Sequence, residues 1–171
     1  NSLIEKVNTS MMDFDLTGSA QAIKYFIIED LSNWYVRVNR RRFWGSEDSM
    51  EKRTAYDTLA EALITVSKLL APFVPFHSEK VYLDLEGDDN LDSIHFENYP
   101  EALPNLVDTD LEKKMELLKQ VVELGRGSRS SRNVKIRQPL SRAVIKGVEP
   151  FGEGLISIIK SGSGYILSFG I

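Results

Sequence analysis

The chain contains no cysteine and only 2 histidines. Without cysteine, neither a disulfide nor a thiolate-bound metal site can form, and this absence is compatible with a reducing cytoplasm. The histidines, His77 and His95, lie far apart in the sequence and lack the ligand spacing of a zinc site. We therefore expect no bound metal, and we interpret His77, which lies between prolines and an apolar helix, as structural.

Long apolar runs are also missing. No stretch is long enough to cross a bilayer, and the N-terminal residues lack the pattern of a signal peptide. The 171 residues are 42% hydrophobic and 27% charged, which suits one packed domain or one domain with a small appendage. Because the first residues have the pattern of a helix interior and no initiator methionine precedes them, we expect a fragment of a longer cytoplasmic protein without membrane contact.

Acidic residues are absent from two segments of a chain whose net charge is −4. Residues 31–45 carry four arginines, and residues 124–148 carry seven lysines and arginines, with no aspartate or glutamate in either segment. The rest of the chain is therefore strongly acidic. A polyanion would respond to this local distribution of charge rather than to the total.

The first basic segment combines arginine with aromatic residues. It lies within residues 30–44, DLSNWYVRVNRRRFW, which contain two tryptophans, a tyrosine and a phenylalanine. Planar guanidinium groups match phosphate oxygens, and aromatic faces stack on unpaired bases. The segment therefore predicts a surface for folded RNA. The alternative is an ordinary helix terminus, where the helix dipole favours cations without any ligand.

A helical wheel separates the side chains of this segment. Trp34 lies on the apolar stripe, which favours packing, whereas Trp44 lies beyond the stripe and could either pack or stack. Asp30 and Arg37 share the face of Trp34, so they could form a half-buried ion pair, or the helix could project beyond the core. We favour a mixture in which Asp30, Trp34 and Arg37 are structural and residues 40–42 and Trp44 are exposed or at the rim.

Glycine and serine alternate with regularly spaced cations in the second basic segment. Arg126, Arg129 and Arg132 recur every three residues and should share one side of a helix. Small residues let the backbone approach a phosphate, which the cations neutralise. The alternative is a flexible, charged helix end. The candidate RNA-binding residues of the two segments are Arg40, Arg41, Arg42, Trp44, Arg126, Arg129, Arg132, Lys135 and Arg137.

The spacing of apolar residues predicts mainly helices. We expect Thr17, Gly18 and Ser19 to start the second helix, and Thr109 with Glu112 to form a capping box at the start of the fifth. The fold class is then mainly α: an antiparallel helix bundle over residues 1–140 and a small α/β appendage over residues 141–171. The expected elements are helices around residues 3–7, 17–44, 49–71, 75–85 and 109–133, a short extended segment at 94–96, strands at 142–146 and 165–169, and a short helix at 150–160.

Three segments together resemble one known family. They are the run of residues 30–44, then LLAPFVPFHSEKVYLDL at residues 69–85, then SRNVKIRQPLSRAVI at residues 131–145. In this order they resemble the tRNA anticodon-binding domain of isoleucyl-tRNA synthetase, most closely its archaeal and eukaryotic-type branch. The related valyl and leucyl enzymes have a comparable helix, but usually without the Asn-Trp-Tyr and Arg-Arg-Arg-Phe-Trp sequences. Residues 161–171 do not match the family pattern.

The resemblance implies a parent enzyme that uses ATP, with Mg, to activate isoleucine and transfer it to its tRNA. The HIGH and KMSKS signatures of the nucleotide-binding domain are absent, so this chain alone is predicted to be non-catalytic and to hold no cofactor. Its expected partners are isoleucine tRNA and the catalytic and editing domains of the same polypeptide. The alternatives are the equivalent domain of a valyl or leucyl enzyme, or a helical protein-interaction module whose arginines bind an acidic protein.

Overall fold

The computed structural model describes residues 1–45, 48–86, 92–135, 138, 140–143, 155 and 165–167. The chain divides into two compact units, Asn1–Val107 and Asp108–Ile171, and each is described by itself. This division falls before the last long helix, whereas the sequence predicts a boundary at residues 140/141, which stays a prediction. The predicted class is confirmed, since the fold is mainly α.

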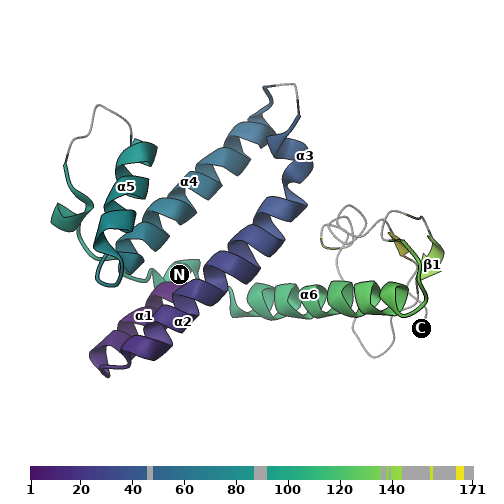
Figure 1. Ribbon diagram of the computed structural model, residues 1–171, viewed down its shortest axis with the longest axis horizontal. Helices are drawn as coiled ribbons and strands as arrows, with labels where there is room; N and C mark the ends of the chain where they lie inside the picture. Colours follow the sequence, from purple (N-terminus) through teal and green to yellow (C-terminus); the bar gives the residue numbers. More distant parts are fainter. Residues whose placement is uncertain are drawn as a thin grey trace. The chain divides into compact units, whose positions relative to one another are not determined.

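The first unit is a bundle of helices (Figure 1). The chain ascends through α2, η1 and α3 and returns along α4, which contacts both α2 and α3. Helix α5 packs against the end of α4, and two single 3₁₀ turns follow. The bounds are α1 Ser2–Met12, α2 Leu16–Tyr25, η1 Phe26–Val36, α3 Arg40–Phe43, α4 Met50–Leu70, α5 Pro75–Glu86, η2 Ile94–Phe96 and η3 Pro104–Leu106.

The core of this unit lies where α1, α2 and α4 meet. Val7, Ile23 and Leu69 are fully buried there, together with the smaller Ala22 and Val66. Burying one such aliphatic side chain contributes roughly 1.5–3 kcal/mol, so this cluster fixes the end of the bundle at which the chain enters. The opposite end, where α3 meets α4, has an aromatic cluster instead.

The turn between α1 and α2 corrects a predicted cap. Asp15, rather than Thr17 or Ser19, caps α2, because its carboxylate accepts a hydrogen bond from the backbone N–H of Gly18 at 2.8 Å. A Cβ on residue 18 would lie 2.0 Å from the Asp15 carboxylate, so glycine leaves room for the cap. Phe14 adopts a left-handed backbone with φ of 59° to close α1.

The predicted single helix over residues 17–44 is not uniform. Its middle, Phe26–Val36, is a π-helix, in which the hydrogen bonds join residues five apart. The wider winding changes the spacing of side chains, but the predicted apolar stripe still faces the core, since Leu31 is buried and Phe26 and Ile27 pack against the core cluster. Leu31 is buried, Trp34 is only half-buried, and the helix breaks at Asn39 before α3 restarts.

The bounds of α4 and α5 confirm the sequence prediction within one residue. Ser49 caps α4 by accepting from the N–H of Lys52 at 3.2 Å, and Pro75 opens α5. The expected extended segment at residues 94–96 is wrong. It is a 3₁₀ turn, because Ser93 caps it and the Glu79 carboxylate accepts from the N–H of Ile94 at 2.9 Å.

The second unit begins with α6, Thr109–Ser130. Its cap is Asp108, which accepts from the N–H of Leu111 at 2.9 Å, so the predicted capping box starting at Thr109 is wrong by one residue. Strands β1, Leu140–Ala143, and β2, Tyr165–Leu167, pair in parallel and confirm two strands in the appendage. Of the predicted helix at 150–160, all but Leu155, which is helical, lies outside the described residues.

Candidate nucleic-acid interface

The first candidate surface is the α3 corner, which we define as Asn39, α3 and Trp44. Asn39 is buried, and its side-chain amide forms hydrogen bonds with two neighbouring residues. Its Nδ2 donates to the carbonyl of Tyr35 at 3.0 Å, and its Oδ1 accepts from Nη1 of Arg42 at 3.0 Å. Asn39 therefore closes the last turn before the break and orients one of the three consecutive arginines.

An aromatic cluster anchors the α3 corner to α4. Phe43 is buried and packs edge-on against Tyr35, Tyr56 and Trp44, with ring centroids at 6.3, 5.0 and 6.4 Å. The hydroxyl of Tyr35 donates to the carbonyl of Ala55 at 3.0 Å, and the hydroxyl of Tyr56 donates to the carbonyl of Phe43. Such edge-to-face pairs add about 0.5–1.5 kcal/mol each, so a four-residue helix is held in place.

The three arginines of α3 are all exposed, as the sequence predicts. Arg42 lies 3.9 Å from Glu51, an exposed contact that contributes little. The guanidinium of Arg40 lies over the Trp44 ring, 5.2 Å from its centroid. Arg37, Arg40 and Arg41 make no ion pair within the part of the chain that the structure describes. Arg37, for which we favoured a structural role, is exposed.

The acidic residues at the start of α4 are largely occupied by other cations. Arg53 donates two hydrogen bonds to Asp48, which lowers the pKa of Asp48 and raises that of Arg53. Lys52 reaches back and donates from Nζ to the carbonyl of Gly45 at 2.8 Å. The negative charge of Asp48 is therefore neutralised by Arg53. Asp48 does not neutralise the positive charge of Arg40 or Arg41.

The second candidate surface is the α6 end, which we define as residues 126–135 with Gln138. Arg126, Arg129 and Arg132, which the spacing predicts on one side of a helix, differ in exposure, and Arg132 lies beyond the last helical residue. Arg129 is 3% exposed and donates from Nη1 to the carbonyls of Lys135 and Gln138, at 2.9 and 2.8 Å. Its guanidinium is thus committed to the chain that follows the helix and is not placed to meet a phosphate.

The other cations of the α6 end differ from one another. Arg126 is half-buried, whereas Arg132 and Lys135 are exposed beyond the last helical residue. Asn133, with φ of 55°, ends the helix in a left-handed turn, in which the N–H of Val134 donates to the carbonyl of Arg129 at 2.9 Å. Arg137 lies outside the described residues.

Asn39 and Arg129 are the two residues whose roles the sequence reasoning missed. Asn39 lies between Val38 and Arg40, at the start of a run of three arginines, and nothing in the spacing marks it as buried. Nothing in the spacing marks Arg129 either, because its guanidinium donates to the carbonyls of Lys135 and Gln138, which lie beyond the last helical residue.

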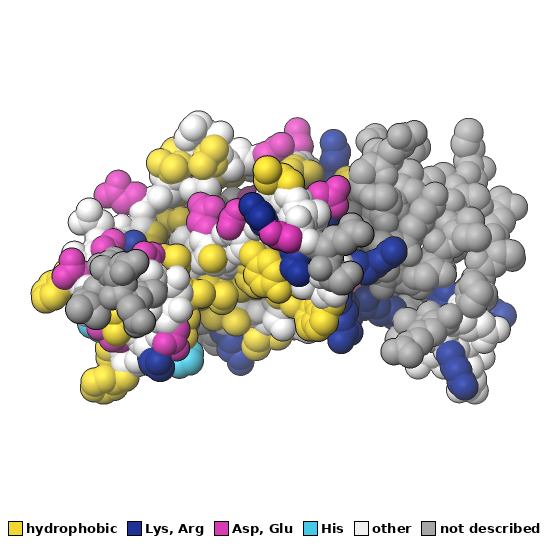
Figure 2. All heavy atoms as spheres, turned by 90° about the horizontal axis from the view of Figure 1, so that it is seen from above, with side chains coloured by type: hydrophobic (Ala, Val, Ile, Leu, Met, Phe, Trp, Pro, Cys, Tyr) yellow, Lys and Arg dark blue, Asp and Glu magenta, His cyan; other side chains and the backbone are white. Residues whose placement is uncertain are grey.

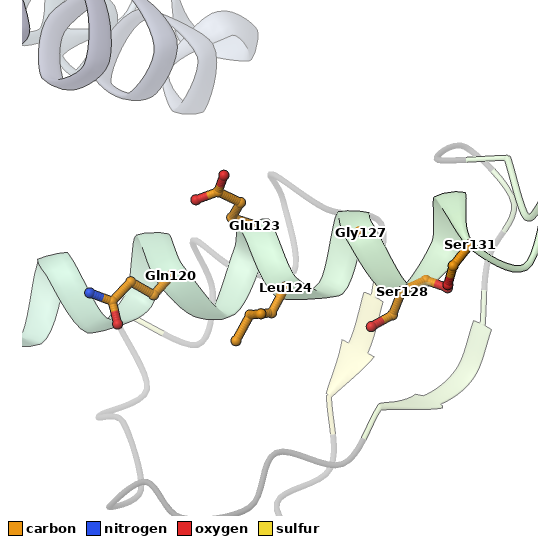
Figure 3. Close-up of a pocket in the computed structure, with 6 residues that line it drawn as sticks. All are labelled: Gln120, Glu123, Leu124, Gly127, Ser128 and Ser131. Carbon is orange, nitrogen blue, oxygen red and sulfur yellow. The ribbon is translucent and has the colours of Figure 1, made fainter.

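A shallow hollow of about 630 Å³ runs along α6 (Figure 3), and the described residues that line it include one acidic side chain and no cation. In the close-up, Leu124 and Ser128 project from one side of the helix and Glu123 from the other. Gly127 has open space around it. The described lining offers no positive charge to a polyanion. The described residues that line it are Gln120, Glu123, Leu124, Gly127, Ser128 and Ser131.

The surface around α5 and η2 has a mixed character (Figure 2), with apolar, acidic, basic and histidine side chains interspersed. His77 is exposed there, so our interpretation of it as structural is wrong. Among the described side chains, no group of three or more histidines or carboxylates could hold a metal ion. No described helix has the length and apolar character needed to cross a bilayer.

A helix bundle with an exposed corner of arginine and tryptophan has the features of a nucleic-acid-binding helical domain. The chain belongs to the family of anticodon-binding domains of tRNA ligases, whose model matches residues 1–145. The resemblance described from the sequence is thereby confirmed at the level of the family.

The relatives are isoleucine–tRNA ligases. The isoleucine–tRNA ligase of Chlamydia trachomatis is 40% identical over 157 residues, which cover 92% of this chain and 15% of the relative. Isoleucine–tRNA ligase 2 of Bacillus cereus is 43% identical over 145 residues, 85% of this chain and 14% of the relative. The chain therefore spans about 15% of the length of these relatives. The closer likeness to the archaeal and eukaryotic-type branch stays a prediction.

Proposed function

We propose that the chain is the anticodon-binding part of an isoleucine–tRNA ligase. In this role it holds the anticodon stem-loop of isoleucine tRNA, while a catalytic domain elsewhere in the same polypeptide attaches the amino acid. The observation that carries the proposal is the α3 corner, where Arg40 and Arg41 are exposed and make no ion pair among the described residues, in a chain of net charge −4. The family match supports tRNA as the ligand of that surface.

The mechanism is binding by charge neutralisation. Each exposed arginine that meets a phosphate releases condensed counterions, so affinity falls with salt in proportion to the number of contacts. Phosphate contacts position the RNA, and contacts to splayed bases give specificity. The residues we propose for contact are Arg40, Arg41, Arg42, Trp44, Arg126, Arg132, Lys135 and Arg137.

The parent enzyme supplies the chemistry. It would use ATP with Mg to activate isoleucine, in a nucleotide-binding domain whose signatures this chain lacks. The partners of the chain are then isoleucine tRNA and the catalytic and editing domains of the same polypeptide, in the cytoplasm. This assignment predicts that the full-length protein aminoacylates isoleucine tRNA efficiently. The activity should be lost when residues 1–145 are removed.

The direct test is binding of the chain to isoleucine tRNA and to a non-cognate tRNA across a salt series. The proposal predicts a preference for isoleucine tRNA and a steep fall of affinity with salt. The Arg40→Glu/Arg41→Glu double variant should lose binding. The matched control, Lys6→Glu/Lys24→Glu, makes the same change of charge on exposed positions of α1 and α2 and should bind like the wild type.

Three results would contradict the proposal. A preference for valine or leucine tRNA would assign the chain to one of those enzymes. Weak binding to every tRNA, with tight binding to an acidic protein, would make it a protein-interaction module. Equal losses in the two charge-reversal variants would show that total charge, and not the α3 corner, attracts the RNA.

A further inference from the structure

Trp44 and Phe43 are adjacent in sequence but have opposite environments. Phe43 is buried in the aromatic cluster, whereas Trp44 is 69% exposed. Exposure alone does not mark a ligand site, since Phe76 and Phe96 are 91% and 83% exposed. The feature that carries the argument for Trp44 is the guanidinium of Arg40 over its ring. Trp44 directly follows α3, and the anchored Phe43 beside it restricts the backbone that carries the indole.

The Trp44 ring has one occupied face. Arg40 lies one turn earlier on α3, and this spacing puts both side chains on the same side of the helix. The Arg40 guanidinium carbon is 5.2 Å from the ring centroid, within the range of a cation–π interaction. A ring covered on both faces could not be 69% exposed, so the second face is open.

We propose that Trp44 is a one-sided stacking platform for a single unpaired base of RNA, with Arg40 as the positioning residue behind it. The inference rests on the proposed function, because it names how the α3 corner would read its RNA ligand. Arg40 fixes the orientation of the indole and places a positive charge beside the stacked base. The exposed edge of its guanidinium remains able to donate to a phosphate of the same strand.

The chemistry of the platform selects unpaired nucleotides. Bases within a duplex are already stacked on their neighbours, whereas bases of a loop are free to stack on an aromatic ring. A surface made of arginines alone would bind the phosphates of a duplex and of a hairpin loop similarly. The platform therefore predicts a preference for RNA with an unpaired loop, over and above the charge-driven binding.

The fluorescence of Trp44 reports this stacking directly, because the chain has only 2 tryptophans. The Trp34→Phe variant leaves Trp44 as the only indole. The probes are a hairpin RNA with the isoleucine tRNA anticodon stem and loop, and a blunt duplex of equal length. Complex formation is followed separately by the anisotropy of a dye on the RNA. The hairpin should quench the Trp44 emission, and the duplex should bind without quenching it.

Two variants of Trp44 that retain Trp34 keep the affinity test independent of the Trp34→Phe substitution. Replacing Trp44 by leucine should weaken hairpin binding about ten- to a hundredfold, the range for loss of one stacked base, with little effect on duplex binding. Trp44→Phe should keep part of the affinity and lose the fluorescence change. Arg40→Gln should reduce the quenching at saturating hairpin, because the indole is then no longer held.

The outcomes separate this inference from the proposed function. Hairpin binding that depends on salt, without quenching and without loss in Trp44→Leu, overturns the platform and leaves the proposed function intact. Equal quenching by hairpin and duplex also overturns it, because no unpaired base is then required. Failure of the chain to bind any RNA overturns the proposed function and the platform together.

Discussion

The α3 corner and the α6 end are both arginine-rich, but they use arginine in opposite ways. At the α3 corner, the chain after the helix is held by Lys52 and the aromatic cluster, so Arg40 and Arg41 are left exposed. At the α6 end, Arg129 is buried and donates to the carbonyls of Lys135 and Gln138, which follow the helix. Local composition therefore does not separate an exposed arginine from one that is buried and structural. The difference is whether nearby carbonyls need a donor.

The largest expected effect comes from removing the buried arginine. Arg129→Ala leaves the carbonyls of Lys135 and Gln138 without this donor inside the second unit. We expect a loss of about 3 kcal/mol in the free energy of unfolding, measured by urea denaturation. The matched control is Arg132→Ala, an exposed position at which the free energy should change by less than about 0.5 kcal/mol. Equal stability of the two variants would contradict the structural role of Arg129.

The buried amide of the α3 corner should come next. Asn39→Ala removes the donor to the Tyr35 carbonyl and the acceptor for Arg42. We expect a loss of about 1–2 kcal/mol in the free energy of unfolding. Asn39→Asp keeps the acceptor but not the donor and should lose less. If Asn39→Ala unfolded like the wild type, the amide would not be what holds this turn.

The exposed arginines should change binding and not stability. In Arg40→Gln/Arg41→Gln, two cations are removed from a surface where they make no ion pair among the described residues. The slope of log affinity for tRNA against log salt should fall by about 1 per arginine. Urea denaturation should give an unchanged free energy within about 0.5 kcal/mol. An unchanged slope would show that neither arginine meets a phosphate.

The smallest effect concerns an ion pair of the first unit that includes no residue of the α3 corner. Lys68 donates to Glu97 at 2.9 Å, and this hydrogen bond and charge lower the pKa of Glu97. A lowered carboxyl pKa stabilises the fold fully above the ordinary value of about 4.3, and that contribution is lost as the pH falls through the lower folded value. Lys68→Gln should make the fold less dependent on pH in this acidic range. Acid titration of both proteins, followed by circular dichroism, measures the difference.

The sequence predicted the elements whose ends carry local signals. Ser49 and Pro75 mark the starts of α4 and α5, because a cap and a first-turn proline act within a few residues. Asp15 and Asp108 were missed because neighbouring threonines offered the same chemistry. The family motifs also predicted the function class, since they extend over most of the chain.

The remaining features depend on contacts that no local pattern encodes. The π-helical winding of η1 changes the period on which the apolar stripe was counted. The exposure of Trp44 beside a buried Phe43 follows from how α3 packs on α4. The burial of Arg129 depends on residues six and nine positions further along the chain. Sequence spacing alone therefore predicted the exposure of the three arginines of α3 but not the burial of Arg129.

The most direct measurement is a paired one on Arg41→Gln and Arg129→Gln. For each variant, the affinity for the isoleucine tRNA anticodon stem-loop and the free energy of unfolding are determined in the same buffer. The account predicts that Arg41→Gln lowers the affinity and leaves the unfolding free energy unchanged. It predicts the reverse for Arg129→Gln, measured where the protein is still folded. If Arg41→Gln kept full affinity while Arg129→Gln lost it without loss of stability, the account of the two basic segments would be contradicted.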